Sequence, residues 1–184
     1  MLLDLIDLSK LRRAIVYALL LMAVLIVQNL ALSRLTGWGV RALIIPAMVV
    51  GVGLFEDGLW GGMVGLAAGY FSDLAYADHV VLFTILLPTA GFFAGALGKY
   101  MLHKGFMSYM TLALVVLSVV AFCQMFSFLF FAGEDARAFQ ALYLGGTASR
   151  RIWRTGLIQT AWSLVWAIPL YFPCKLIAGR PMGR

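Results

Sequence analysis

Long runs of apolar residues, separated by short polar stretches, follow one another along most of the chain. A helix that crosses the hydrocarbon core of a bilayer needs roughly 20 such residues, so about six crossings fit into this length. The runs predict spans at about 14–32, 40–55, 59–74, 80–97, 109–131 and 153–172. The second and third runs are short for a full crossing. Ahead of the first run, residues 1–13 alternate leucine and isoleucine with aspartate, which predicts a short amphipathic start at the cytoplasmic surface.

The composition extends this picture to the whole chain. Of its 184 residues, 63% are hydrophobic and 12% are charged, whereas a soluble domain is typically about half apolar and about a quarter charged. We therefore expect one integral membrane domain over residues 1–184 with an all-α fold, a polytopic helix bundle. The net charge of +6 comes from basic residues near predicted span ends, where they face lipid headgroups. Accordingly, we expect contact with membrane lipid and no nucleic-acid partner.

The lysines and arginines near the span ends also predict the orientation. With the N-terminus inside, eight of them fall on the cytoplasmic side and six on the outer side. The eight are Lys10, Arg12, Arg13, Lys99, Lys104, Lys175, Arg180 and Arg184. The six are Arg34, Arg41, Arg137, Arg150, Arg151 and Arg154. The charges that precede the first span decide the matter, and we expect both termini in the cytoplasm.

Glycines recur at every fourth position of the third run, in the segment DGLWGGMVGLAAGYFSDL. Gly61, Gly65 and Gly69 share one stripe of a helix, because steps of four residues drift by only about 40° each. The fourth run carries Gly91 and Gly95 at the same spacing. Lipid gives helices no hydrophobic drive to pair, so close backbone contact between small residues takes that role. The pattern predicts a tight hairpin of the third and fourth helices, or a surface for a partner helix.

Carboxylates flank this glycine stripe. Glu56 and Asp57 precede the third helix, where the positive end of the helix dipole favours negative charge. Asp73 lies at the opposite end, where the dipole and the nearby lipid both penalise its charge. We expect Asp73 to find a partner, either an outer arginine such as Arg41 or Arg150 or the N-terminus of a neighbouring helix. A structural contact of this kind is favoured over proton or ion coupling.

Motifs that carry chemistry are missing from the sequence. It has no phosphate-binding Walker A motif, no cluster of metal ligands, no nucleophile elbow and no pair of carboxylates inside a span. Cys123 and Cys174 form no C-x-x-C pair, and we expect both to be buried apolar residues. Gln124 and Gln159, inside the fifth and sixth spans, would join these helices by hydrogen bonds or line a small cavity. We expect no catalytic residue, no metal and no cofactor, and a protein that is not an enzyme.

The stretch from Gly53 to Lys104 resembles the core of MreD, a family of rod-shape-determining membrane proteins of bacteria. Three features carry the resemblance: an acidic residue before a glycine-patterned helix, an aspartate that ends this helix, and a second glycine-patterned helix with a basic exit. The matching residues are Glu56, Gly61, Gly65, Gly69, Asp73, Gly91, Gly95 and Lys99.

This resemblance implies a non-enzymatic scaffold or regulator of cell-wall elongation in the bacterial inner membrane. The implied partner is an MreC-like bitopic protein within the elongasome, whose single transmembrane helix would contact a helical surface of this chain. MreB, a RodA-type glycosyltransferase and a class B penicillin-binding transpeptidase are implied as further members of the complex. The resemblance also implies a bundle like the S component of an energy-coupling-factor transporter.

That shared architecture gives a second hypothesis, in which the chain is itself a substrate-binding S component for a vitamin. Such a transporter needs a polar pocket on the outer side, for which Arg41, Asp73, Gln124 and Gln159 are the candidates. It also needs a face of small residues on which the coupling subunit docks, and the glycine stripe would serve.

Overall fold

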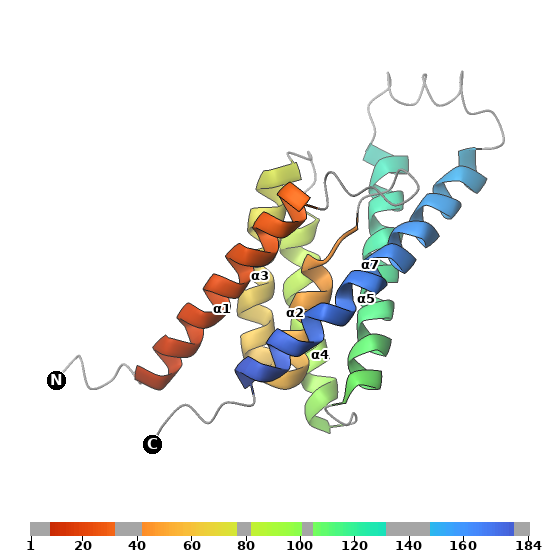
Figure 1. Cartoon of the computed structure of the whole chain (residues 1–184). Coiled ribbons are helices and arrows are strands. Elements are labelled where there is room, and N and C mark those ends of the chain that lie inside the picture. Colours follow the sequence, from red (N-terminus) through yellow and green to blue (C-terminus); the bar gives the residue numbers. More distant parts are fainter. Residues whose placement is uncertain (1–7, 32–41, 77–81, 101–104, 132–147, 179–184) are drawn as a thin grey trace.

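The computed structural model describes residues 8–31, 42–76, 82–100, 105–131 and 148–178. All regular structure in these ranges is helical, which confirms the all-α prediction for them. With the labels of Figure 1, the helices are α1 (Leu8–Ile26), its π-helical continuation η1 (Val27–Ala31), α2 (Ile45–Phe55), α3 (Gly58–Tyr76), α4 (Phe83–Tyr100), α5 (Phe106–Phe131) and α7 (Ala148–Ala178). Successive helices run in alternate directions, so α1 begins and α7 ends at the same, lower end of the bundle in Figure 1.

Three stretches are long and apolar enough to cross a membrane: Leu11–Leu30, Phe106–Gln124 and Gly156–Ala178. They belong to α1 with η1, to α5 and to α7, and they are compatible with a membrane protein. The glycine-rich α3 and α4 have 19 and 18 residues and reach about the thickness of a bilayer core. The amphipathic start expected at 1–13 lies partly outside the described residues, and residues 8–13 are the first turns of α1 rather than a separate helix.

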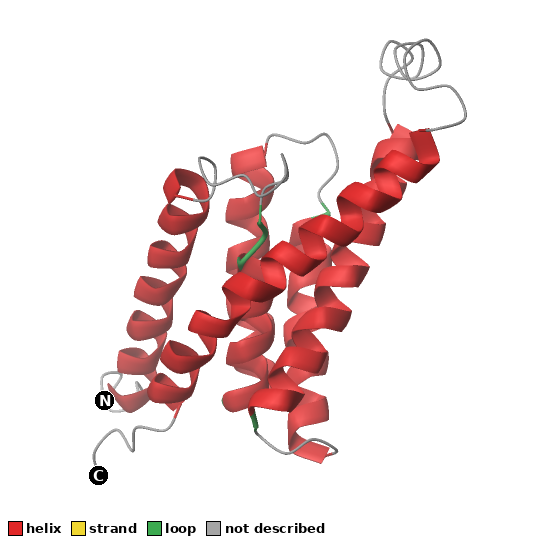
Figure 2. Cartoon of the chain, turned by 45° about the vertical axis from the view of Figure 1, so that its right-hand side comes forward, coloured by secondary structure: helices red, strands yellow, loops and turns green. Residues whose placement is uncertain are grey.

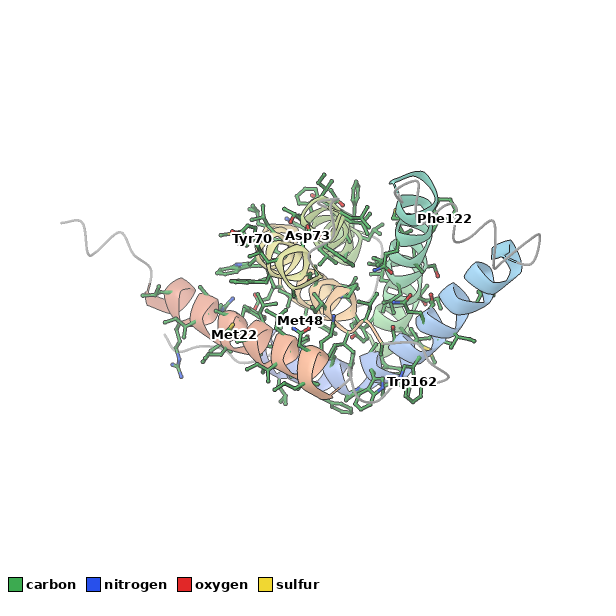
Figure 3. The ribbon with its side chains drawn as sticks, turned by 90° about the horizontal axis from the view of Figure 1, so that it is seen from above. Met22, Met48, Tyr70, Asp73, Phe122 and Trp162 are labelled. Atoms are coloured by element: carbon green, nitrogen blue, oxygen red, sulfur yellow. The ribbon has the colours of Figure 1, made fainter. Side chains whose placement is uncertain are left out.

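The short helix α2 forms the centre of the bundle. All of its 11 residues are buried, and it contacts α1, α3, α4, α5 and α7. Met48 of α2 lies amid the surrounding helices, whereas Phe122 of α5 lies at the periphery (Figure 3). At 1.5 Å per residue α2 is about 16 Å long, roughly half the thickness of the hydrocarbon core. A helix of this length does not cross a bilayer by itself.

The start of α2 differs from the predicted span at 40–55. Residues 42–44 are buried but not helical, and α2 begins only at Ile45. Pro46 in the first turn favours a helix start here, because its ring fixes φ and its missing N–H would have no partner within the helix. At the other end, α2 stops at Phe55, and Glu56 and Asp57 connect it directly to α3. The connection is therefore too short for α2 and α3 to separate.

An aromatic cluster joins three helices at the lower end of the bundle. The ring of Tyr171 in α7 lies 5.6 Å from that of Phe55 in α2, and 5.2 Å and 5.7 Å from those of Phe106 and Tyr109 in α5, centroid to centroid. These separations are typical of favourable aromatic pairs. The buried Tyr109 hydroxyl also donates a hydrogen bond of 3.1 Å to the Ala167 carbonyl. The oblique α7, which crosses the bundle in Figure 2, is thereby fixed to α2 and α5.

Candidate functional site: the glycine junction

Glycines hold the backbones of α3 and α4 in contact. A carbon added as the Cβ of Gly61 would lie 2.5 Å from the Gly91 carbonyl oxygen, whereas ordinary contacts of such a carbon begin at about 3.4 Å. At Gly65 the added carbon would lie 2.6 Å from the Leu87 carbonyl oxygen. The remaining glycines of the predicted hairpin are crowded in the same way by backbone atoms: Gly69 of α3, and Gly91 and Gly95 of α4. The expected hairpin is therefore present, and its glycines are covered within the chain.

A glycine of α2, which the sequence pattern did not single out, completes this contact. The carbon added at Gly61 would lie 2.6 Å from the Cα of Gly53, and one added at Gly53 would meet the Gly91 carbonyl. Three helix backbones thus meet at Gly53, Gly61 and Gly91, a contact that we call the glycine junction. The spacing of eight residues between Gly53 and Gly61 could have indicated this contact. It does so only because the chain turns sharply at 56–57 and brings α2 against α3.

Gly62 shows that the crowding is specific to one face of α3. Its added carbon would find its nearest neighbours at 3.8 Å and 3.9 Å, the Pro88 carbonyl oxygen and the Phe92 Cβ, which are ordinary contacts. Adjacent glycines of one helix therefore differ in role. Gly61 is required by a backbone approach, while Gly62 lies where a side chain fits.

Asp73 binds the N-terminus of the neighbouring helix α4. Its Oδ1 accepts the amide N–H of Phe83 at 3.0 Å, and its Oδ2 accepts the amide N–H and the hydroxyl of Thr84 at 2.7 Å and 2.6 Å. Of the partners expected for Asp73, the structure shows the N-terminus of a neighbouring helix. The other two, Arg41 and the side chain of Arg150, lie outside the described residues. The positive end of the α4 dipole offsets the unfavourable position of Asp73 at the end of α3. The carboxylate thus joins the two helices at the end of the hairpin where the chain passes from α3 to α4.

Glu56 and Asp57 have different roles although they are neighbours. Asp57 is the N-cap of α3: its Oδ1 accepts the Gly58 amide N–H at 2.9 Å, and its carbonyl accepts that of Gly61 at 3.0 Å. Glu56 turns to α1 instead, where it accepts hydrogen bonds from the Tyr17 hydroxyl at 2.8 Å and from Arg13 Nη1 at 3.2 Å. The dipole argument therefore describes Asp57, while Glu56 is a tertiary contact that the sequence did not reveal.

The upper end of α2 is capped by side chains of two other helices. Gln28 Oε1, from η1, accepts the amide N–H groups of Ile44 and Ile45 at 3.0 Å and 3.1 Å, and Ser163 Oγ, from α7, accepts that of Leu43 at 2.8 Å. All three bonds are buried. Free amides at the start of a buried helix are costly, so Gln28 and Ser163 explain how α2 can begin inside the bundle. Sequence reasoning assigned neither residue this role.

Two further predicted features have weaker support in the structure. Gln124 and Gln159 are half-buried, and no hydrogen bond joins them to each other in the described part of the chain. Cys174 is buried and Cys123 is half-buried, and the two are not bonded. Within the described ranges, no group of three or more histidine, cysteine, aspartate or glutamate side chains is placed to hold a metal ion.

The described residues define an all-helical bundle with three helices able to cross a membrane, in which carboxylate and amide side chains secure the ends of other helices. Comparison of the chain with protein-family models, with curated proteins and with solved structures found no match.

Proposed function

We propose that the chain is a non-enzymatic membrane scaffold of the MreD kind, which acts in bacterial cell-wall elongation and rod shape. The observation that carries this proposal is the use of its carboxylates. Glu56, Asp57 and Asp73, the carboxylates whose side chains the structure describes, are all engaged in contacts within the bundle: Asp57 and Asp73 bind amides at helix starts, and Glu56 binds the Tyr17 hydroxyl and Arg13 of α1. Carboxylates engaged in this way support a structural role for the segment that resembles MreD.

The scaffold acts by offering a rigid helical surface to the single transmembrane helix of an MreC-like partner. The glycine junction supports this rigidity, because three backbones in contact have little room to shift. Since its glycines are covered, the partner helix binds outward side chains of the hairpin instead, such as Leu66 of α3 and Phe93 of α4, which are exposed. MreB, a RodA-type glycosyltransferase and a class B penicillin-binding transpeptidase join through that complex.

The proposed topology has six helical segments in the inner membrane, an architecture of the S-component kind, with both termini in the cytoplasm. Three cationic side chains support this orientation: Arg12 at the start of α1, Lys99 at the end of α4 and Lys175 at the end of α7. All three are exposed, and they lie at the end of the bundle where α1 begins (Figure 1). Cytoplasmic ends of spans carry an excess of such residues.

Affinity purification tests the scaffold. The tagged chain is extracted from its native membranes in mild detergent, and the proteins that accompany it are identified by mass spectrometry. Recovery of an MreC-like protein with cell-wall synthases supports the proposal, and recovery of paired ATP-binding cassette subunits overturns it. Two variants locate the surface that binds the partner helix. Leu66→Trp on α3 is expected to abolish recovery of the MreC-like protein. Val115→Trp on α5, at an equally lipid-facing position (52% exposed), is expected to keep it.

The alternative function, a vitamin-binding S component, is favoured by one observation. Helices that begin or end at mid-membrane form substrate sites in many transporters, and the short α2 begins inside the bundle. Here, however, the amides of residues 43–45, ahead of and at the start of α2, bind the chain's own side chains. Separate substitution of Asp73, Gln124 and Gln159 discriminates between the functions. A transporter loses ligand binding in one or more of these variants, whereas a scaffold has no ligand to lose.

A further inference from the structure

The first helix is attached to the bundle along one stripe. Its buried side chains recur at intervals of three or four residues or lie next to one another: Tyr17, Leu21, Val24, Leu25 and Gln28. The large apolar side chains of its other faces are exposed: Leu11, Ile15, Leu19, Met22, Ile26 and Leu30. α1 therefore differs from α2, which is enclosed on every side.

A polar anchor lies near each end of this stripe. At the lower end, the Glu56 carboxylate, whose side chain is 9% exposed, binds the Tyr17 hydroxyl and the Arg13 guanidinium. At the upper end, Gln28 Oε1 binds two amides ahead of and at the start of α2. Gln28 belongs to the π-helical turn η1, and such turns occur frequently at functional sites.

The apolar part of the stripe cannot fix α1 by itself. An apolar side chain that leaves a protein surface for lipid loses little, because lipid tails are as apolar as leucine. Close backbone packing is the other means of holding a helix, and it needs small residues. The buried stripe of α1 and η1 contains no glycine, alanine or serine, in contrast to the glycines between α3 and α4. Among the described residues, the two anchors are therefore the main polar attachments of α1.

We infer that α1 is a displaceable helix, held against α2 and α3 by the Glu56 and Gln28 anchors and free to move away when both are lost. The inference rests on the proposed placement of the bundle in a bilayer, and it requires no partner protein. Movement of α1 exposes to lipid the surface of the bundle that α1 covers. This surface includes residue 56 and the ring of Trp60, whose centroid lies 6.2 Å from that of Tyr17. The glycine junction, which has no residue of α1, stays closed.

Distance measurement between two spin labels tests the inference. The labels replace Met22 on α1 and Val115 on α5, both 52% exposed, in a chain whose native cysteines are replaced by alanine and which is held in lipid nanodiscs without partners. The parent chain is expected to give one narrow distance distribution. In Glu56→Ala with Gln28→Ala, a second population is expected, shifted by about 10 Å, one helix diameter.

Matched variants separate displacement from general disorder. Asp57→Ala removes the adjacent carboxylate, which binds the Gly58 amide and not α1 among the described hydrogen bonds, and is expected to keep the parent distribution. Label pairs on α3 and α4, at Met63 and Phe93, are expected to keep theirs in every variant. An unchanged distribution in the double variant overturns the inference, and so does an equal shift in Asp57→Ala or between α3 and α4. If the double variant cannot be purified, Glu56→Ala and Gln28→Ala alone decide, since each releases one end of α1 and must broaden the α1–α5 distribution.

Discussion

Replacing Gly61 by alanine provides the sharpest test of the glycine junction. The added carbon would lie 2.5 Å from the Gly91 carbonyl oxygen and 2.6 Å from the Gly53 Cα, and ordinary contact requires at least 3.4 Å, so the backbones must separate by about 0.9 Å. A gap of 0.5–1 Å removes roughly a quarter to a half of each van der Waals contact, and overpacking costs about 1–3 kcal/mol. Alanine gains about 0.5–1 kcal/mol over glycine in a helix, so we expect a net destabilisation of about 0.5–2 kcal/mol.

Gly62→Ala is the matched control. It gains the same helix propensity at the next position of the same helix, and its added carbon meets its nearest neighbour at 3.8 Å. We expect this variant to be more stable than the parent by about 0.5–1 kcal/mol. Reversible unfolding of both variants in mixed micelles, followed by circular dichroism, measures the difference. Equal stabilities, or a Gly61→Ala variant more stable than Gly62→Ala, would refute the backbone-contact argument.

Three further predictions concern the helix ends. Asp73→Ala is expected to lower the free energy of unfolding by about 1–2 kcal/mol, because it removes the cap of α4. Asp73→Asn, which keeps an acceptor oxygen, is expected to lower this free energy by less. An Asp73→Asn variant less stable than Asp73→Ala would contradict the capping role. Ser163→Ala leaves the buried Leu43 amide without its acceptor and is expected to cost about 1–3 kcal/mol, measured in the same unfolding assay; parent-like stability would show that another acceptor replaces it. Cysteines placed at Lys99 and Lys175, in a cysteine-free chain, are expected to react with a membrane-impermeant maleimide in inverted vesicles only, and labelling of either in intact spheroplasts would reverse the proposed orientation.

The sequence was sufficient for those parts of the fold that depend on local pattern. Apolar runs located the helices, because a helix long and apolar enough to cross a membrane leaves a continuous signal along the chain. The four-residue spacing of Gly61, Gly65 and Gly69 located the hairpin, because a small-residue stripe and its facing helix are neighbours in sequence. The favourable place of Asp57 at the start of the third helix followed from its position alone, although its N-cap hydrogen bond was not predicted.

The parts that failed depend on which helices become neighbours. Nothing near Glu56 in sequence shows that Tyr17 and Arg13 approach it from α1, more than 35 residues earlier. The late start of α2 likewise depends on Gln28 and Ser163, which come from opposite ends of the chain. The apolar run at 40–55 predicts a single helical span, because hydropathy carries no information on which backbone amides are bound by distant side chains. It therefore cannot show that the helix begins only at Ile45.

The enclosure of α2 affects how the bundle meets membranes of different thickness. A helix that touches lipid must match its apolar length to the bilayer by tilting or by deforming the lipid around it. Because every residue of α2 is covered by other helices, α2 has no such length to match. In the proposed membrane placement, a thicker or thinner bilayer therefore acts on α2 only through the helices around it.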